Sequence, residues 1–123
     1  MTEQIQLIHL PQHLDERRGN ISIMEELPFP VKRIFYIYGV PVNVMRGGHA
    51  HKTCKQLLIA VCGAVIIKIG DGREFVLDCP DMALYVPARY TIHLVFLTEN
   101  TTLLVLASKK YDRNDYIYNS GVL

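Results

Sequence analysis

The chain has 123 residues, half of them hydrophobic, and a formal net charge of +1 at pH 7. This length and composition suit a single domain with a proper apolar core, and we expect residues 1–123 to form one. The near-neutral charge argues against a protein that binds nucleic acid or a membrane surface through bulk charge. No apolar run reaches the ~20 residues of a membrane span. Three cysteines without a CxxC spacing and a polar N-terminus predict reduced thiols and a cytoplasmic protein.

Short β-type segments separated by turn signals follow one another along the chain. The predicted strands cover Ile5–Leu10, Ile21–Glu26, Val31–Val40, Gln56–Cys62, Ala64–Ile69, Arg73–Leu77, Met82–Val86, Tyr90–Leu97 and Thr102–Ala107. Prolines exclude Leu27–Pro30 from a central strand. The Tyr-rich tail Lys109–Asn119 is predicted as a short helix or an irregular arm. No segment has the pattern of a three-turn helix, so the chain is all-β, either a sandwich or a barrel.

The segment Arg46–Lys52 carries two of the five histidines, His49 and His51, directly after a Gly pair. Residues i and i+2 of a strand point to the same side of the sheet, so the two imidazoles are predicted side by side. Such a pair can ligate a metal ion or move protons near neutral pH. Glycines at this point permit unusual backbone angles and let a ligand approach closely.

The spacing after the histidines resembles the first motif of the cupins, His-x-His-x4-Glu-x6-Gly, with Gln56 in place of the Glu and with Gly63 in place. Cupins are small β-barrels of the jelly-roll type, also called double-stranded β-helices. The second cupin motif, counted from Pro87, puts Ile92 where a metal ligand would stand, and His93 is expected on the opposite face. A metal-dependent cupin enzyme is therefore the weaker alternative, and we expect no metal ion and no other cofactor.

A narrower set of matching blocks resembles the sugar-nucleotide 3,4-ketoisomerases, the WxcM-like branch of the cupins. The blocks are Pro28–Ile37, Arg46–Lys52, Leu84–Pro87, Val105–Ser108 and Tyr111–Ile117. The resemblance implies a metal-free enzyme that moves the carbonyl of a dTDP-4-keto-6-deoxyhexose from C4 to C3 through an enediol. It further implies a role in making 3-amino sugars for surface polysaccharides such as lipopolysaccharide.

The same resemblance assigns roles to individual residues. His51 is the expected shuttling base, with His49 assisting, because histidine titrates near the working pH. Tyr36 is expected to hydrogen-bond the sugar. The expected substrate-binding cations are Arg46, for the pyrophosphate, and Arg18, Arg33 and Lys52.

Two further expectations come from the resemblance. Family members carry Trp-His-Glu after the Tyr-Val-Pro strand, where this chain has Thr91-Ile92-His93. That difference leaves open a second function class, a cupin that binds a nucleotide sugar without converting it. The family also forms homodimers by exchanging N-terminal strands, and the apolar segment Ile5–Leu10 followed by a polar connector suits such an exchange.

Overall fold

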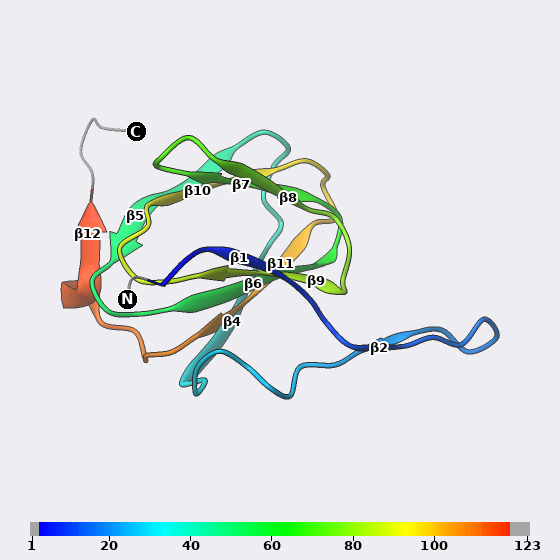
Figure 1. Cartoon of the computed structure of the whole chain (residues 1–123). Helices are drawn as coiled ribbons and strands as arrows, with labels where there is room; N and C mark the ends of the chain where they lie inside the picture. Colours follow the sequence, from blue (N-terminus) through cyan, green and yellow to red (C-terminus); the bar gives the residue numbers. More distant parts are fainter. Residues whose placement is uncertain (1–2, 119–123) are drawn as a thin grey trace.

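The computed structural model describes residues 3–118, which form two five-stranded antiparallel sheets packed face to face (Figure 1). The first sheet contains, in spatial order, β1 (Gln6–His9), β9 (Met82–Val86), β6 (Gln56–Cys62), β11 (Thr102–Ala107) and β4 (Arg33–Tyr38). The second contains β12 (Tyr116–Tyr118), β5 (Met45–His51), β10 (Ile92–Phe96), β7 (Val65–Ile69) and β8 (Glu74–Leu77). From β4 to β12 the chain crosses between the sheets at every connection except β7–β8. The predicted all-β jelly-roll fold is confirmed.

The main core lies between the sheets and comes from the alternation of side chains along each strand. In β7, Val65, Ile67 and Ile69 are buried, while the residues between them are only partly covered. They meet inward residues of the first sheet such as Leu103 and Val105 of β11. Alternating apolar residues on both sheets thus form one continuous core.

A smaller apolar cluster covers part of the outer face of the first sheet. Leu57 and Ile59 of β6 point away from the main core, and Phe29 and Leu10 pack on them. Pro-flanked Phe29 belongs to the coil that joins β3 to β4, so this segment acts as a cover and not as a strand. Both faces of β6 are buried for this reason.

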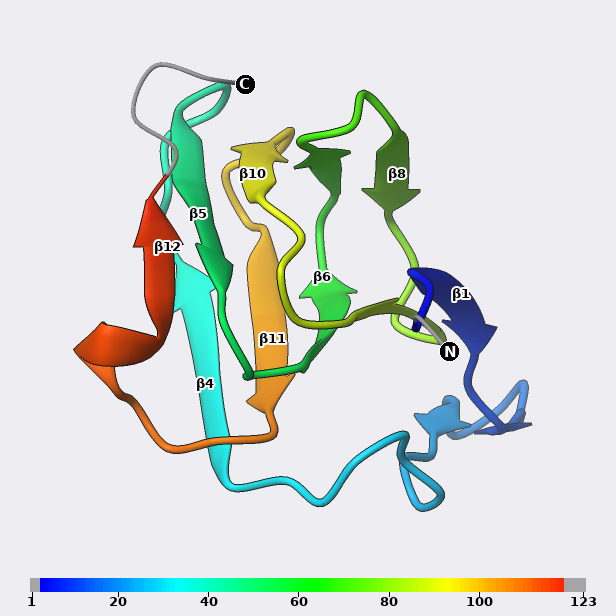
Figure 2. The ribbon, with the colours of Figure 1, turned by 60° about the vertical axis from the view of Figure 1, so that its left-hand side comes forward.

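An arm projects from the sandwich at the end opposite β12 (Figures 1 and 2). It is a hairpin of two short strands, β2 (Gln12–His13) and β3 (Ile21–Ser22). The predicted strand Ile21–Glu26 was therefore too long. No helix within residues 3–118 is long and apolar enough to cross a membrane.

The tail differs from the prediction. Its described part contains a 3-10 turn, η1 (Arg113–Asp115), followed by β12, which pairs antiparallel with β5. The prediction of a short helix or irregular arm missed this strand. Figure 2 shows β12 running beside β5 at the edge of the second sheet.

Candidate active site

The two histidines of β5 lie side by side, as the two-residue spacing predicted. The ring centroids of His49 and His51 are 5.7 Å apart, and the ring planes are nearly perpendicular, at 81°. Both side chains are partly buried.

A β-bulge at the Gly pair sets the position of His49. In the pairing of β5 with β10, His49 is opposite Ile92 and Gly47 is opposite His93, so Gly48 is an extra residue. Gly47 and Gly48 have φ angles of 100° and 89°, which other residues adopt only with strain. A Cβ on Gly47 would lie 2.6 Å from the carbonyl oxygen of Ile92. Only glycine lets the strands approach this closely.

Strand β12 brings aromatic rings against the histidines. Tyr116 pairs with His51 and Tyr118 with His49, so all four side chains share one face of the sheet. The Tyr116 ring centroid is 4.5 Å from that of His51 and 4.8 Å from that of His49. From the sequence, Tyr116 is expected only to pack the tail against the barrel or a second subunit, although the alternation in Tyr116-Ile117-Tyr118 is a strand signal that could have placed it at the site.

A cavity of about 470 Å³ opens beside His49, whereas His51 is not among the residues that line it. Its lining combines His49, Tyr116 and Gln56 with the apolar side chains of Ile92 and Leu58. Cavities of this size, mostly apolar with a few convergent polar groups, are typical of small-molecule sites.

Two arginines also line this cavity. Arg33 lies on the inward face of β4, with its guanidinium 4.3 Å from the ring centre of Phe35 and 5.4 Å from that of Tyr111. Arg46 lies on β5, three residues before His49, and is more exposed. Guanidinium groups at the wall suit phosphate oxygens, which they bind with two parallel hydrogen bonds.

Burial lowers the pKa of both histidines below the ordinary value of 6.5. For His49, a hydrogen bond to the backbone of Gly47 acts in the opposite direction, and His93 lowers the pKa further. For His51, burial is again the main cause of the lowered pKa, and the neighbouring His49 lowers it further. The carboxylate of Asp115 raises the pKa of His51, and Arg33 lowers it. Both imidazoles are therefore mainly neutral near pH 7, the form that accepts a proton.

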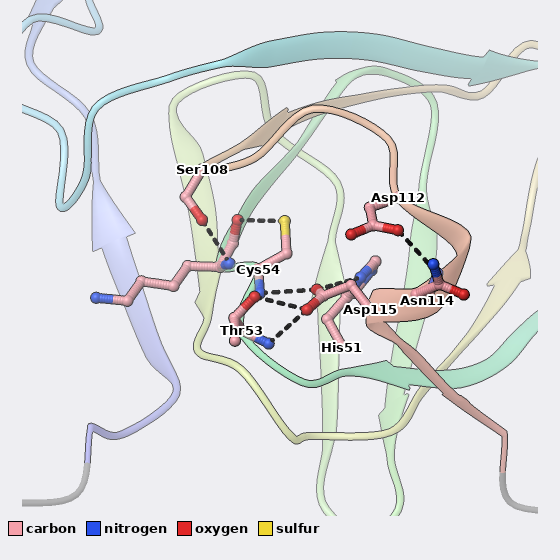
Figure 3. A network of polar contacts seen from close by, with 8 residues as sticks. His51, Thr53, Cys54, Ser108, Asp112, Asn114 and Asp115 are labelled. Carbon is pink, nitrogen blue, oxygen red and sulfur yellow. Dashed lines mark hydrogen bonds and ion pairs between the residues drawn. The ribbon is translucent and has the colours of Figure 1, made fainter.

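An acidic residue that our sequence analysis missed, Asp115 of η1, stands behind the His51 ring. The Oδ2 atom of Asp115 is 3.6 Å from Nδ1 of His51. Figure 3 shows the carboxylate between this ring and Thr53. No local pattern of the sequence relates Asp115 to the histidines, because the contact depends on the pairing of β12 with β5.

Two of the predicted substrate-binding cations lie outside the cavity. Lys52 follows β5 and lines a neighbouring depression together with Tyr111 and Arg113. Arg18 lies on the arm, pairs with Asp15 at 2.8 Å and has a side chain that is 84% exposed. The arm leaves the sandwich at the end away from the cavity of its own chain (Figure 1), so the role of Arg18 in substrate binding stays a prediction.

Tyr36 occupies a rim position. It lies on the outward face of β4, is 61% exposed, and still borders the cavity. Its ring contacts that of Tyr38, at 5.6 Å. A contact between the Tyr36 hydroxyl and a sugar therefore stays a prediction.

Ile92 and His93 are placed as the alternation of a strand requires. Ile92 faces the cavity beside His49, and His93 faces a separate depression beside Lys68 and Glu74. The His93 ring packs on Gly48, and its Nε2 atom is buried with no hydrogen-bond partner among the described residues. Within residues 3–118, no three His, Cys, Asp or Glu side chains converge as the ligands of a metal ion would.

Comparisons with known proteins all point to the same family. A family described as WxcM-like, C-terminal matches residues 3–121. The TDP-4-oxo-6-deoxy-alpha-D-glucose-3,4-oxoisomerase of Aneurinibacillus thermoaerophilus is 33% identical over 116 residues, which cover 90% of this chain and 84% of that protein.

Solved structures agree with this match. The sugar 3,4-ketoisomerase QdtA of Thermoanaerobacterium thermosaccharolyticum, in complex with TDP, is 36% identical, with a TM-score of 0.88 over 97% of this chain and 90% of that chain. The TDP-quinovose 3,4-ketoisomerase WlaRB of Campylobacter jejuni is 32% identical, with a TM-score of 0.87 over 97% and 95% of the two chains. The chain therefore belongs to the WxcM-like family, whose relatives named above are sugar 3,4-ketoisomerases.

Proposed function

We propose that this protein is a sugar-nucleotide 3,4-ketoisomerase that converts a dTDP-4-keto-6-deoxyhexose into its 3-keto isomer. The observation that carries the proposal is a pair of neutral imidazoles: His49 lines a cavity that also holds two arginines, and His51 lies beside it with its ring centroid 5.7 Å from that of His49. The relatives named above, which act on TDP-linked sugars, support the substrate class.

The reaction moves one carbon-bound hydrogen and leaves the sugar's overall oxidation state unchanged. A base removes the proton from C3, and the electrons of that C–H bond form a C3–C4 double bond while the C4 carbonyl becomes an enediol oxygen. A proton then returns to C4, the hydroxyl on C3 loses its proton, and the carbonyl re-forms at C3. C4 is reduced as C3 is oxidised, so no external oxidant or reductant is required.

The residues supply this chemistry as follows. His51 takes the C3 proton and returns a proton to C4, and His49 handles the hydroxyl protons. A neutral imidazole with a pKa near the working pH accepts and releases a proton readily, which contributes roughly 10²–10⁴-fold to a rate. Arg33 and Arg46 bind the pyrophosphate, and Tyr36, from the rim, contacts the sugar.

Hydrogen exchange tests the proposal directly. The protein is incubated with the dTDP-4-keto-6-deoxy sugar in heavy water, and deuterium at C3 and C4 is followed by NMR. We expect exchange and formation of the 3-keto isomer by the wild type, and a loss of at least 100-fold in His51→Asn. His9→Asn is the matched control, since His9 lies exposed on β1 and pairs with Asp81.

Two outcomes would overturn the proposal. One is binding of the dTDP-sugar by the wild type without any exchange. This result would indicate the alternative function, a cupin that binds a nucleotide sugar without converting it, which the presence of Ile92 in the cavity wall leaves open. The other is a His51→Asn variant that exchanges deuterium as fast as the wild type. Either result would separate the family membership of the chain from the activity of its relatives.

We also propose a homodimer that exchanges N-terminal strands. Among residues 3–118, the strand β1 lies at the edge of its sheet and pairs with β9 alone, so the same pairing can form with a second copy. The arm that follows β1 exposes Leu14 and Ile21, which favours burial against a partner. Such a dimer is the arrangement in which Arg18 could meet a cavity, namely that of the second copy. A sedimentation experiment that finds a monomer at micromolar concentration would reject it.

The pathway and the location stay predictions. A 3-keto sugar nucleotide is the kind of compound that an aminotransferase converts into a 3-amino sugar for surface polysaccharides. All three cysteines are free, in keeping with the predicted cytoplasmic location.

A further inference from the structure

The carboxylate of Asp115 lies on the side of the His51 ring that carries Nδ1. The distance from Nδ1 to Oδ2 is 3.6 Å, which is an ion-pair distance and slightly too long for a hydrogen bond. The side chains of His51 and Asp115 are 12% and 11% exposed, so both are largely shielded from bulk solvent. The contact therefore acts on the histidine through a charge that solvent screens only weakly.

Three donors from the turn after β5 fix this carboxylate. Oδ1 accepts a 2.6 Å hydrogen bond from the Thr53 hydroxyl and a 3.1 Å bond from the Thr53 backbone, and Oδ2 accepts a 3.1 Å bond from the Cys54 backbone (Figure 3). The Lys52 backbone also donates to the Asp115 carbonyl, at 2.6 Å. The residues that hold Asp115 therefore directly follow His51 in the sequence, so the same chain segment positions both side chains.

These contacts keep Asp115 ionised. Burial acts to raise the pKa of Asp115, but the hydrogen bonds from Thr53 and Cys54 act in the opposite direction, and the net effect is a lowered pKa. Asp115 is consequently a fixed negative charge throughout the pH range around neutrality.

We propose that Asp115 is a positioning residue for the isomerisation: it holds His51 in the tautomer with the proton on Nδ1, so that Nε2 is the base, and it stabilises the imidazolium formed when Nε2 takes the sugar proton. The proposal rests on the proposed function. The proton taken from C3 forms the Nε2–H bond, and its release to C4 restores the neutral ring. No net charge stays on His51 after one turnover.

The surroundings of His51 explain why this carboxylate matters. His49, on the same strand, and Arg33, on β4, both disfavour a charged His51 ring, and the ring of Tyr116 packs against that of His51. Among the described groups that shift its pKa, Asp115 alone favours the protonated form. Without Asp115, the intermediate with a protonated His51 would face two unfavourable neighbours and no favourable one.

The test compares Asp115→Asn with two other variants. Asparagine keeps the shape and one acceptor oxygen for the Thr53 donors but removes the charge, and Asp115→Glu restores it. Asp112→Asn is the matched control, because Asp112 caps the same 3-10 turn through the Asn114 backbone, at 2.9 Å, and has no contact with His51 in the structure. Deuterium exchange gives kcat and KM across pH, and ¹⁵N NMR of the imidazole gives the tautomer of His51 without any substrate.

For Asp115→Asn we expect kcat to fall about 10–100-fold, on the scale of the loss when the outer partner that orients a metal-ligating histidine is removed, with KM within about twofold. The acid limb of kcat should move to lower pH, because the pKa of His51 falls when the carboxylate charge is gone. Asp115→Glu should recover part of the rate, and Asp112→Asn should keep both rate and pH limb. A purely structural role would lower the rate without moving the limb.

Two results would overturn the inference. One is an Asp115→Asn variant, folded by its melting curve, whose acid limb and His51 tautomer match those of the wild type. The other is NMR of the wild type that places the ring proton on Nε2, a measurement that needs no variant and decides the matter if Asp115→Asn does not fold. An inactive wild type with the proton on Nδ1 would instead reject the proposed function and leave the tautomer assignment intact.

Discussion

Substituting Gly47 by alanine should destabilise the protein more than the same change at any ordinary turn, and the structure provides a matched comparison. Gly47 has a φ of 100°, and Gly72, in the β7–β8 turn, has a φ of 101°. A Cβ at Gly72 would have no heavy atom within 4 Å, whereas one at Gly47 would lie 2.6 Å from the Ile92 oxygen and 3.3 Å from Cα of His93. The two variants share the backbone strain and differ in the collision.

The expected magnitudes follow from these two terms. Left-handed backbone costs a residue with a Cβ about 1–2 kcal/mol, which is the whole effect expected for Gly72→Ala. Gly47→Ala adds overpacking, about 1–3 kcal/mol, because both colliding atoms belong to the backbone of β10 and cannot rotate away. Strand β10 is also held by β7 on its other side, which prevents it from retreating. We expect Gly47→Ala to be less stable than Gly72→Ala by about 2 kcal/mol.

Urea unfolding followed by circular dichroism measures this difference, and the melting temperatures should differ by roughly 8 °C, at about 4 °C per kcal/mol for a domain of this size. Gly47→Ala should also lose isomerase activity, because β5 must move away from β10 at the residue opposite His93 and carry His49 with it. Gly72→Ala should keep its activity. Equal free energies of unfolding for the two variants would show that the bulge is not as tight as the geometry indicates.

Four further predictions concern the site. Because burial lowers the pKa of His49 and His51, the acid limb of kcat/KM should have its midpoint below pH 6.5. The same lowering means that the unfolded chain binds protons more readily, so the free energy of unfolding should fall as the pH drops below about 6.5 and level off below the folded-state pKa values; urea titrations that find constant stability from pH 7 to 5 would contradict this. Dialysis against a chelator should leave activity unchanged, since Gln56 and Ile92 stand where metal-binding cupins carry ligands, and a stoichiometric transition metal in elemental analysis would refute the expectation. Arg33→Gln should raise KM about 10–100-fold, the equivalent of the roughly 1.5–3 kcal/mol of a hydrogen bond to a charged group, whereas Lys52→Gln, outside the cavity, should change KM less than twofold; a reversed order would move the pyrophosphate to the depression beside Lys52.

The features that the sequence predicted well are those that depend on the neighbours of a residue along the chain. The two-residue spacing of His49 and His51 put both rings on one face, because side chains alternate along any strand. The Gly pair before them indicated unusual backbone angles, and both glycines do have positive φ. Alternation also separated Ile92 from His93, and the prolines kept Phe29 out of a strand.

The pairing of distant segments decided the remaining features. Thr53 and Asp115, which share a hydrogen bond, are 62 residues apart in the sequence, and only the docking of β12 on β5 brings them together. That docking also put Tyr116 over the histidines and an acidic group behind His51. The arm carried Arg18 away from the cavity of its own chain for a similar reason, since its direction depends on where β1 pairs. Local periodicity determines which way a side chain points, but the identity of the side chain opposite is set by sheet register, which the hydrophobic core of the whole fold selects.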